Sequence, residues 1–370
     1  MGRAATRVLM TADAVGGIWT YALDLSAALA RHGVACTLAV LGPGLDAARL
    51  AEAAAADVEA IDLGHAPEWL AAGPDAVARG GAALAALAQD RGADLLQCNH
   101  PAFGAATTFP CPVLAVGHSC VATWWDAVRG TPLPAEFAWQ ADLIGRGYVA
   151  ADAVAVPSAA FAAATAARYR LPRRPVVLWN GRAAAEPFRA TPPVRAAVTA
   201  GRLWDEGKDV ATLDRAAALT DVPVRAIGPH RGPNGASLAT THLQAVGSLP
   251  AAALREVFAT RPVFLSAARY EPFGLAVLEA AQAGCALVLS DIPTFRELWD
   301  GAATFVPPGD AAGFAAELDG LVGDPDRRER LGEAARERAA RYTLDAAANG
   351  VARLYQALLA ERAGLDGRAA

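Results

Sequence analysis

Lysine is almost absent from this sequence. Of the 33 lysine and arginine residues in the 370-residue chain, a single one, Lys208, is a lysine. The two residue types are not equivalent, because the planar guanidinium favours bidentate contacts whereas the compact ammonium acts as a strongly hydrated point charge. Lys208 is therefore either a lysine that occurs by chance in an arginine-rich composition or a position that requires an ammonium group.

Several other absences exclude whole classes of protein. The five cysteines form no C-x-x-C pair and no even-numbered disulfide framework, which favours a reducing compartment. His118 and Cys120 have no second pair of ligands at zinc spacing. No apolar run is long enough to cross a membrane, and the first residues turn polar at Thr11 and Asp13, before a signal-peptide core develops. We therefore expect a cytoplasmic protein without a metal site.

The charge and the apolar content narrow the class further. The net charge of −5 and the pI of about 5.7 argue against nucleic acid and anionic lipid as partners. Apolar residues make up 54% of the chain, much of it alanine, so a large core can form. At roughly 150 residues per domain, the length predicts two domains.

Short apolar runs alternate with helical patterns along the whole chain, which predicts parallel sheets covered on both faces. A segment rich in glycine and proline, 180–193, separates two such alternations and reads as a linker. The predicted strands are 7–12, 34–41, 94–98, 112–117, 153–157 and 175–179 before it, and 195–200, 223–227, 242–246, 262–266, 286–290 and 303–306 after it.

This order predicts an α/β protein with two facing Rossmann-like, doubly wound domains. We expect an N-terminal domain over 1–180, a C-terminal domain over 181–343, and a last segment, 344–370, that is almost entirely helical. Ligands of such sheets lie at the carboxyl ends of the strands, so the site is expected in the cleft between the two domains.

The first turn after a strand contains Gly16 and Gly17. Glycines at the start of a helix let backbone N–H groups approach an anion or a sugar, although a tight turn alone would also explain them. Their spacing is not G-x-G-x-x-G, and no acidic residue follows at the expected distance, so a nicotinamide dehydrogenase is the least favoured enzyme class.

Two cations, Arg202 and Lys208, follow the predicted strand that ends at residue 200, in the segment GRLWDEGKDV. Cations at the carboxyl end of a strand suit a diphosphate, and an ammonium is a good point-charge partner for phosphate oxygens. A solvated loop is the alternative. The presence of the sole lysine in this segment favours a functional role.

The segment 266–291 holds two carboxylates eight residues apart, Glu271 and Glu279. Glu271 follows a strand, and Phe273, Gly274 and Leu275 begin a helix whose free N–H groups face the strand end. Carboxylates accept hydrogen bonds from the vicinal hydroxyls of a ribose or hexose. Surface carboxylates that favour the helix dipole are the alternative explanation.

Taken together, these segments resemble glycosyltransferase family 4, the retaining group with the GT-B fold. The family has a glycine-rich first turn, an arginine–lysine segment and an E-x7-E motif, which here reads from Glu271-Pro272-Phe273-Gly274-Leu275 to Glu279. His118 in AVGHS and Asn180-Gly181 also match family positions. The resemblance covers nearly the whole chain. It departs in Trp179-Asn180-Gly181-Arg182, where the family has proline before the asparagine and an apolar residue, then aspartate, after the glycine.

The resemblance implies roles for these positions. Arg202 and Lys208 would bind the donor diphosphate, Glu279 the ribose hydroxyls, and Glu271 the transferred sugar, beside the amides of Phe273, Gly274 and Leu275. Gly16 and Gly17 would approach the phosphates or the acceptor, and His118 would lie beside the sugar. The catalytic set is therefore His118, Glu271, Arg202 and Lys208. The last helix, about 344–362, would cross back onto the first domain.

The predicted reaction moves a hexose-type sugar from a nucleoside-diphosphate sugar to an acceptor hydroxyl, with retention implied by the resemblance alone. No D-x-D motif suits a metal, because Asp324-Pro325-Asp326 falls in a late turn between helices, so cations and helix N-termini would neutralise the leaving diphosphate. No cofactor is expected beyond the donor. On the acceptor side, Trp124 and Trp125 could stack on a small-molecule, glycan or lipid-linked acceptor or fill the core, and His100 is a further candidate.

Two rival functions remain open at this point. A non-hydrolysing nucleotide-sugar epimerase would need additional acids and bases, and the E-x7-E block fits a transferase better. A catalytically silent nucleotide-sugar-binding subunit is the second rival, and the intact Arg202, Lys208, Glu271 and Glu279 argue against it.

Overall fold

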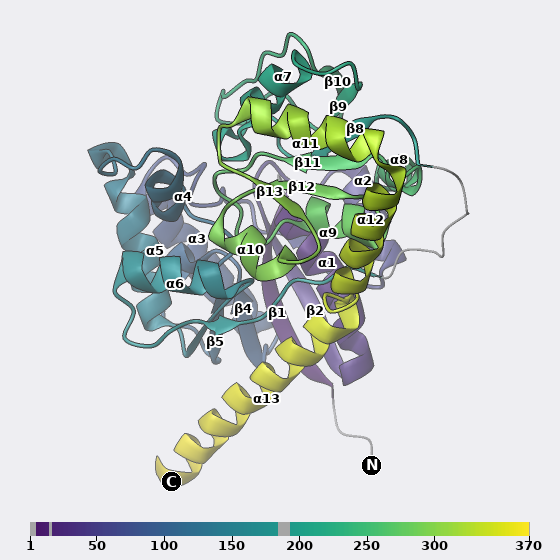
Figure 1. Ribbon diagram of the computed structural model, residues 1–370. Helices are drawn as coiled ribbons and strands as arrows, with labels where there is room; N and C mark the ends of the chain where they lie inside the picture. Colours follow the sequence, from purple (N-terminus) through teal and green to yellow (C-terminus); the bar gives the residue numbers. More distant parts are fainter. Residues whose placement is uncertain (1–4, 15–16, 184–192, 370) are drawn as a thin grey trace. The chain divides into compact units, whose positions relative to one another are not determined.

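A computed structural model of the protein describes residues 5–14, 17–183 and 193–369 (Figure 1). The chain divides into two compact units, with boundaries at Asn180/Gly181 and Thr343/Leu344. The first unit consists chiefly of the residues up to Asn180 together with the last helix, and the second consists chiefly of residues 181–343. Most of the predicted linker, 184–192, lies outside the described residues.

The first unit is built on a seven-stranded, all-parallel sheet in the order β3-β2-β1-β4-β5-β6-β7. Its strands are β1 Thr6–Asp13, β2 Val34–Leu41, β3 Glu59–Asp62, β4 Leu95–Cys98, β5 Val113–Val116, β6 Ala153–Val156 and β7 Val176–Val177. Its helices are α1 Gly17–Leu29, α2 Ala47–Ala55, α3 Pro74–Asp90, α4 Val121–Val128, α5 Ala138–Ala150, α6 Ala159–Tyr169 and α13 Leu344–Ala369, with short 3-10 turns at Ala30–His32, Pro101–Gly104 and Ala135–Phe137.

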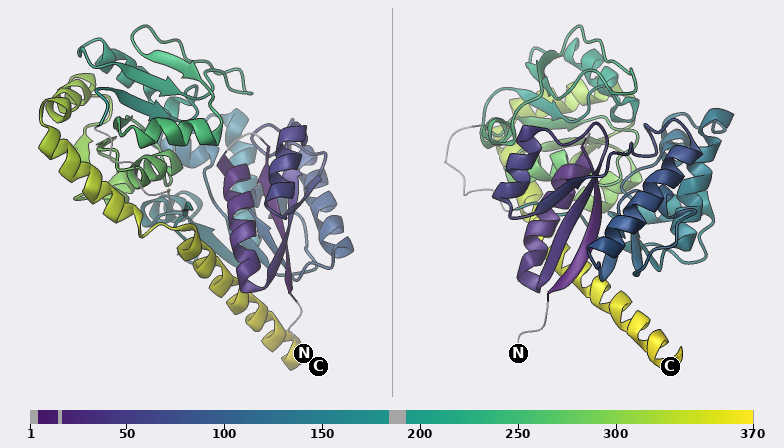
Figure 2. Two further views of the ribbon diagram at one scale, coloured as in Figure 1. Left: turned by 90° about the vertical axis from the view of Figure 1, so that its right-hand side faces the viewer. Right: turned by 180° about the vertical axis from the view of Figure 1, so that it is seen from behind.

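Both faces of this sheet are covered, and β1 shows why such a strand contains an uninterrupted apolar run, here Val8 to Met10. Val8 and Met10 pack into the core under α1 and α13, whereas Leu9 points to the opposite core under α3 and α5. Successive strand side chains alternate between faces, so a strand buried on both sides needs apolar residues at every position. Figure 2 shows α13, in yellow, running along the first unit.

The second unit repeats the plan with six parallel strands in the order β10-β9-β8-β11-β12-β13. The strands are β8 Ala197–Ala200, β9 Val224–Ile227, β10 Gln244–Gly247, β11 Val263–Ser266, β12 Leu287–Ser290 and β13 Thr304–Val306. The helices are α7 Val210–Ala217, α8 Ala251–Ala259, α9 Leu275–Gln282, α10 Pro293–Trp299, α11 Ala311–Gly323 and α12 Pro325–Ala339, with a 3-10 turn at Glu206–Lys208. Helices α7 and α11 cover one face, and α9 and α12 cover the other.

In both sheets the strand order reverses beside the first strand of the unit. The chain winds outward from β1 to β3 and then returns to β4, and it repeats this from β8 to β10 and back to β11. The loops that follow β1 and β4, or β8 and β11, therefore leave the sheet in opposite directions and open a crevice at the carboxyl ends. This topology is the predicted doubly wound α/β class, which is confirmed.

The sequence-based strands differ from the observed ones in two places. Strand β3 was not predicted, because its four residues, EAID, include no buried side chain and it forms an edge of the sheet. The last predicted strand of the first half, 175–179, is reduced to Val176–Val177 at the opposite edge. No helix among the described residues is both long enough and apolar enough to cross a membrane.

Close packing of α5 predicts a stability effect at Gly147. A Cβ atom added there would lie 1.8 Å from the carbonyl oxygen of Pro101 and 2.5 Å from its carbonyl carbon, so backbone would have to move. We expect Gly147→Ala to lower the free energy of unfolding by at least about 2 kcal/mol in urea denaturation. Gly323→Ala is the matched control, because that helical glycine is exposed and has nothing within 4 Å. Equal stability of both variants would contradict the close contact.

Candidate functional site

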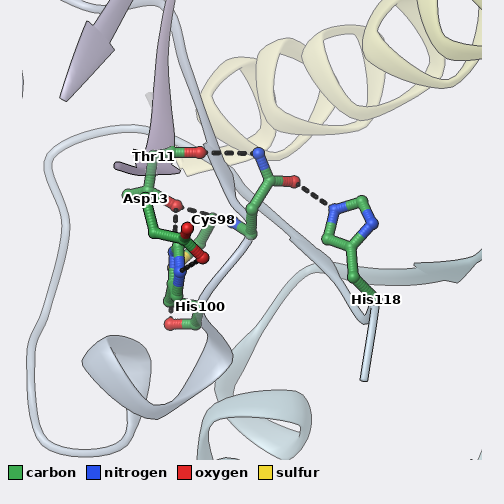
Figure 3. Close-up of polar contacts among 6 residues, drawn as sticks. Thr11, Asp13, Cys98, His100 and His118 are labelled. Atoms are coloured by element: carbon green, nitrogen blue, oxygen red, sulfur yellow. Dashed lines mark hydrogen bonds and ion pairs between the residues drawn. The ribbon is translucent and has the colours of Figure 1, made fainter. Parts of the chain in front are cut away.

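A buried polar network lies at the carboxyl ends of β1, β4 and β5 in the first unit (Figure 3). The Asn99 side-chain amide donates to the backbone oxygen of Thr11 at 2.6 Å, and its backbone N–H donates to the Thr11 hydroxyl at 2.7 Å. The Asn99 oxygen Oδ1 therefore faces the Nε2 atom of His118, 3.1 Å away. Since Oδ1 can only accept, Nε2 carries the proton and Nδ1 of His118 keeps a lone pair.

The network continues through the sheet to the last helix. Gln97 donates to the same Oδ1 of Asn99 at 3.1 Å, and the Tyr355 hydroxyl of α13 donates to Gln97 Oε1 at 2.6 Å. Tyr355 and Gln97 are fully buried. His118 is half-buried and packs edge-on against the Tyr21 ring of α1, with ring centroids 4.5 Å apart. His118 is thus held by two direct contacts, with Asn99 after β4 and with Tyr21 of α1, and Tyr355 of α13 supports Asn99 through Gln97.

A second histidine, His100, is buried in the same crevice with acidic neighbours. Its Nε2 lies 3.4 Å from Asp13 Oδ2 and its Nδ1 lies 3.2 Å from the Thr11 hydroxyl. Burial by itself lowers the pKa of His100, but the hydrogen bond to Asp13 and the negative charges of Glu68 and Asp13 outweigh it and raise that pKa. Burial also raises the pKa of Glu68.

His118 has the opposite electrostatic character. Burial, reinforced by the charge of His100, lowers the pKa of His118 to about 3, against a smaller opposing effect of Asp13. Near neutral pH His118 is therefore neutral and can accept a hydrogen bond at Nδ1, whereas the pKa of the neighbouring His100 is shifted in the opposite direction.

The remaining sequence candidates of the first unit lie at the start of α1, after β4 and on α4. Gly17 is the first residue of α1, and Gly16 lies outside the described residues. His100 is 2% exposed. Trp124 and Trp125, on α4, form an aromatic group in which Trp125 contacts Phe137 at a centroid distance of 5.7 Å and donates to the Thr131 hydroxyl at 3.1 Å.

In the second unit, Lys208, the single lysine of the sequence, lies in the segment after β8 and contacts the loop after β11. Lys208 Nζ forms an ion pair with Glu271 Oε2, and both side chains are mostly buried. The backbone supports this pair, because the carbonyl oxygen of Gly207 accepts from the N–H groups of Arg269 at 2.9 Å and Tyr270 at 3.2 Å. Two predicted site residues, 63 positions apart, therefore meet at the reversal point of the sheet.

Arg202 lies on the same loop but pairs differently. Its guanidinium contacts Asp205 Oδ2 at 2.9 Å and lies over the Trp204 ring, 5.8 Å from the centroid. Asp205 also accepts from the N–H of Gly207 at 2.9 Å, which shapes the turn that carries Lys208. The Nε atom of Arg202 is buried and has no hydrogen-bond partner among the residues that the structure describes. A buried donor without a partner is costly, so this atom is suited to a ligand anion or an ordered water.

Helix α9 begins at Leu275, four residues after Glu271. Gly274 caps the helix with φ of +93°, and a Cβ there would lie 3.3 Å from the Cγ of Glu271, so glycine is required next to this glutamate. Phe273 is buried, and the first N–H groups of α9 have no partner within the helix. Glu279, in the second turn of the helix, forms an ion pair with Arg182.

The four acids and bases on which the sequence prediction rested therefore fall into three pairs. Lys208 and Glu271 contact each other, Arg202 contacts Asp205, and Glu279 contacts Arg182. Arg182, Asp205 and Asn99 were missed as site residues. The departure of Arg182 from the family motif was the one signal that could have drawn attention to it.

Metal ligation has no obvious place in the described part of the chain. No group of three or more His, Cys, Asp or Glu side chains there is arranged to hold a metal ion. Asp324, the first residue of the D-x-D-like triplet, caps α12 by accepting from the N–H of Arg327 at 2.9 Å.

Comparison with known proteins matches both halves of the chain. The sequence model of glycosyltransferase family 4 matches residues 15–183, and the model described as glycosyl transferases group 1 matches residues 236–338. Both models describe glycosyltransferases, so the chain is a glycosyltransferase whose N-terminal half matches the family-4 model. The second match includes the whole Glu271–Glu279 segment, and the first includes His118.

Several known proteins are similar to the chain in sequence or in fold. Phosphatidyl-myo-inositol mannosyltransferase from Mycolicibacterium smegmatis is 40% identical over 88 residues, and this alignment spans 23% of the chain and 23% of that relative. Sucrose-phosphate synthase from Thermosynechococcus elongatus shares the fold with a TM-score of 0.78 and 20% identity over 96% of the chain and 100% of that structure. Anabaena HepE, solved in complex with UDP-glucose, does so with a TM-score of 0.74 and 16% identity over 95% and 100%.

The lowered pKa of His118 predicts a pH effect on stability. Because this pKa lies below its ordinary value of about 6.5, the unfolded chain takes up the proton first as the pH falls. His118 therefore destabilises the folded state progressively below about pH 6.5, by at most about 1.4 kcal/mol per pH unit. We expect His118→Gln to reduce the loss of unfolding free energy between pH 6.5 and pH 4 in chemical denaturation. Parallel pH profiles of the two proteins would contradict this prediction.

Proposed function

We propose that the chain transfers a hexose-type sugar from a nucleoside-diphosphate sugar to an acceptor hydroxyl. The observation that carries the proposal is the pairing of Lys208 with Glu271 at the reversal point of the second sheet, beside the free end of α9. A cation, a carboxylate and unpaired N–H groups in one place match the three chemical parts of such a donor, which are phosphate, sugar hydroxyls and bridging oxygens.

The second unit supplies the donor site in this proposal. Arg202 and Lys208 bind the diphosphate, and the amides of Phe273, Gly274 and Leu275 add the positive end of the helix dipole. Glu271 binds hydroxyls of the transferred sugar, and Glu279 binds those of the ribose. When the donor binds, the Lys208 ammonium leaves the Glu271 carboxylate and contacts phosphate oxygens instead. Its positive charge therefore has a negative partner both before and after binding.

The first unit supplies the acceptor side. The neutral His118 accepts a hydroxyl hydrogen bond at Nδ1, since Nε2 already donates to Asn99. The proposal assigns the surroundings of the acceptor to Trp124, Trp125 and the buried His100. It places Gly16 and Gly17 beside the donor phosphates or the acceptor. The acceptor is a small molecule, a glycan or a lipid-linked compound.

The proposed chemistry is a substitution on one face of the sugar with retention. The acceptor oxygen bonds to the anomeric carbon, the bond from that carbon to the phosphate oxygen breaks, and the departing phosphate takes the acceptor proton. The developing negative charge is stabilised by Arg202, Lys208 and the start of α9, without a metal ion. The hexose assignment is supported by the names of similar proteins, a mannosyltransferase and a structure holding UDP-glucose.

Donor binding tests the proposal directly. We expect UDP-glucose or GDP-mannose to raise the melting temperature of the wild-type protein, and Lys208→Ala to weaken binding of that donor about 10- to 150-fold, since hydrogen bonds to charged groups contribute about 1.5–3 kcal/mol. Lys208→Arg should recover only part of the affinity, because a guanidinium does not reproduce a compact ammonium. Isothermal titration calorimetry measures both effects.

The control variant is Arg327→Ala, which removes an ion pair between α11 and α12 with Glu317, 2.7 Å away, outside the proposed site. Its donor affinity should equal that of the wild type. Absence of any stabilisation by UDP-, GDP-, ADP- and dTDP-sugars would refute the donor assignment. Conversion of the donor sugar without an acceptor would identify an epimerase instead, and tight binding without turnover would indicate a silent binding subunit.

A further inference from the structure

Arg182 lies beside both places where the chain passes between the two units. It follows the Asn180/Gly181 boundary by one residue and pairs in parallel with Thr343, at the second boundary. Its backbone N–H donates to the carbonyl oxygen of Tyr342 at 3.2 Å. The backbone of Arg182 therefore has a fixed position within the second unit.

The side chain of Arg182 extends from this fixed backbone to α9. Its guanidinium forms an ion pair with Glu279, and the two side chains are only 18% and 23% exposed. Gln282, one turn further along α9, donates to the Arg182 carbonyl oxygen at 3.5 Å. Arg182 thus contacts α9 at two points, and one of them is the carboxylate proposed to bind the donor ribose.

A ring contact connects the same segment to the start of α9. The Tyr342 ring packs edge-on against Phe273, with centroids 5.6 Å apart, and Phe273 is buried. Both ends of α9 are therefore held by the segments around residues 182 and 342, which are hydrogen-bonded to each other. A side chain at position 182 is well placed to set the orientation of the Glu279 carboxylate.

We propose that Arg182 is a positioning residue that holds the Glu279 carboxylate for the ribose hydroxyls of the donor, an inference that rests on the proposed function. A carboxylate has about four acceptor positions, and the Arg182 contact joins one guanidinium nitrogen to Oε1. Enough positions remain for two ribose hydroxyls, so Arg182 and the ribose bind Glu279 together. The guanidinium also compensates the carboxylate charge in a largely buried place, where an isolated charge would be costly.

A ligand that lacks the ribose hydroxyls distinguishes a role of Arg182 in ribose binding from a general role in the stability of the fold. We expect Arg182→Ala to weaken binding of UDP about tenfold, as fits the loss of an orienting charge-assisted contact. Binding of 2′,3′-dideoxy-UDP should change less than twofold, because that ligand makes no hydrogen bond to Glu279. Arg182→Lys should recover part of the UDP affinity. Isothermal titration calorimetry measures all three, with GDP and its dideoxy analogue used if UDP does not bind the wild type.

Arg327→Ala serves again as control, since it removes an arginine–glutamate pair of the same unit, and it should leave both affinities unchanged. Thermal unfolding of each variant checks folding, and Arg182→Lys carries the test if Arg182→Ala does not fold. An unchanged or higher UDP affinity in the variant, or equal losses for UDP and its dideoxy analogue, would overturn the role of Arg182 and leave the proposed function intact. Failure of the wild type to bind any of UDP, GDP, ADP and dTDP would overturn the proposed function and this inference with it.

Discussion

The polar features of both units depend on the reversal of strand order in a parallel sheet. Strands β1 and β4, and likewise β8 and β11, are neighbours whose following loops diverge, so side chains at their carboxyl ends are left uncovered by the crossover helices. The network of Thr11 and Asn99 forms at the first of these points, and the pair of Lys208 and Glu271 forms at the second. Residues far apart in sequence meet there because neighbouring parallel strands end at the same edge of the sheet.

Charged groups near the carboxyl ends of the strands already have partners within the protein. Lys208 pairs with Glu271 and Arg182 pairs with Glu279, and His100 lies beside Asp13. Isolated charges in such partly buried places would be costly, and compensated ones are tolerated. For Lys208, a ligand that brings phosphate would exchange one partner for another. For Glu279, a ligand that brings hydroxyls would add to an existing contact. The two kinds of pair therefore respond differently to the same donor.

The sequence predicted the fold well because its evidence is periodic and repeated. Eleven of the thirteen strands in the described part of the chain were predicted close to their observed bounds, because most of them are buried on both faces and therefore consist largely of apolar residues. Edge strands carry a weaker signal. Strand β3 was missed and β7 is shorter than predicted, because an edge is partly solvated and its residues are under less constraint.

The candidate site could be predicted only in part. Family motifs located Lys208, Glu271 and Glu279, but the partner of each charge depends on three-dimensional packing. Arg182 is 97 residues from Glu279, and no spacing rule connects them. The same holds for the opposite pKa shifts of His100 and His118. Burial lowers both pKa values, and only for His100 do the hydrogen bond to Asp13 and the charges of Glu68 and Asp13 outweigh it.

The contact of Tyr355 with Gln97 gives the last helix a second role besides covering the sheet. Through Gln97 and Asn99, this hydroxyl is the far end of a relay of hydrogen bonds that fixes which nitrogen of His118 holds its hydrogen. A chain shortened ahead of Tyr355 would leave a buried amide oxygen without its donor. The loss would affect the orientation of His118, more than 200 positions earlier in the sequence, although none of the residues that contact His118 is changed.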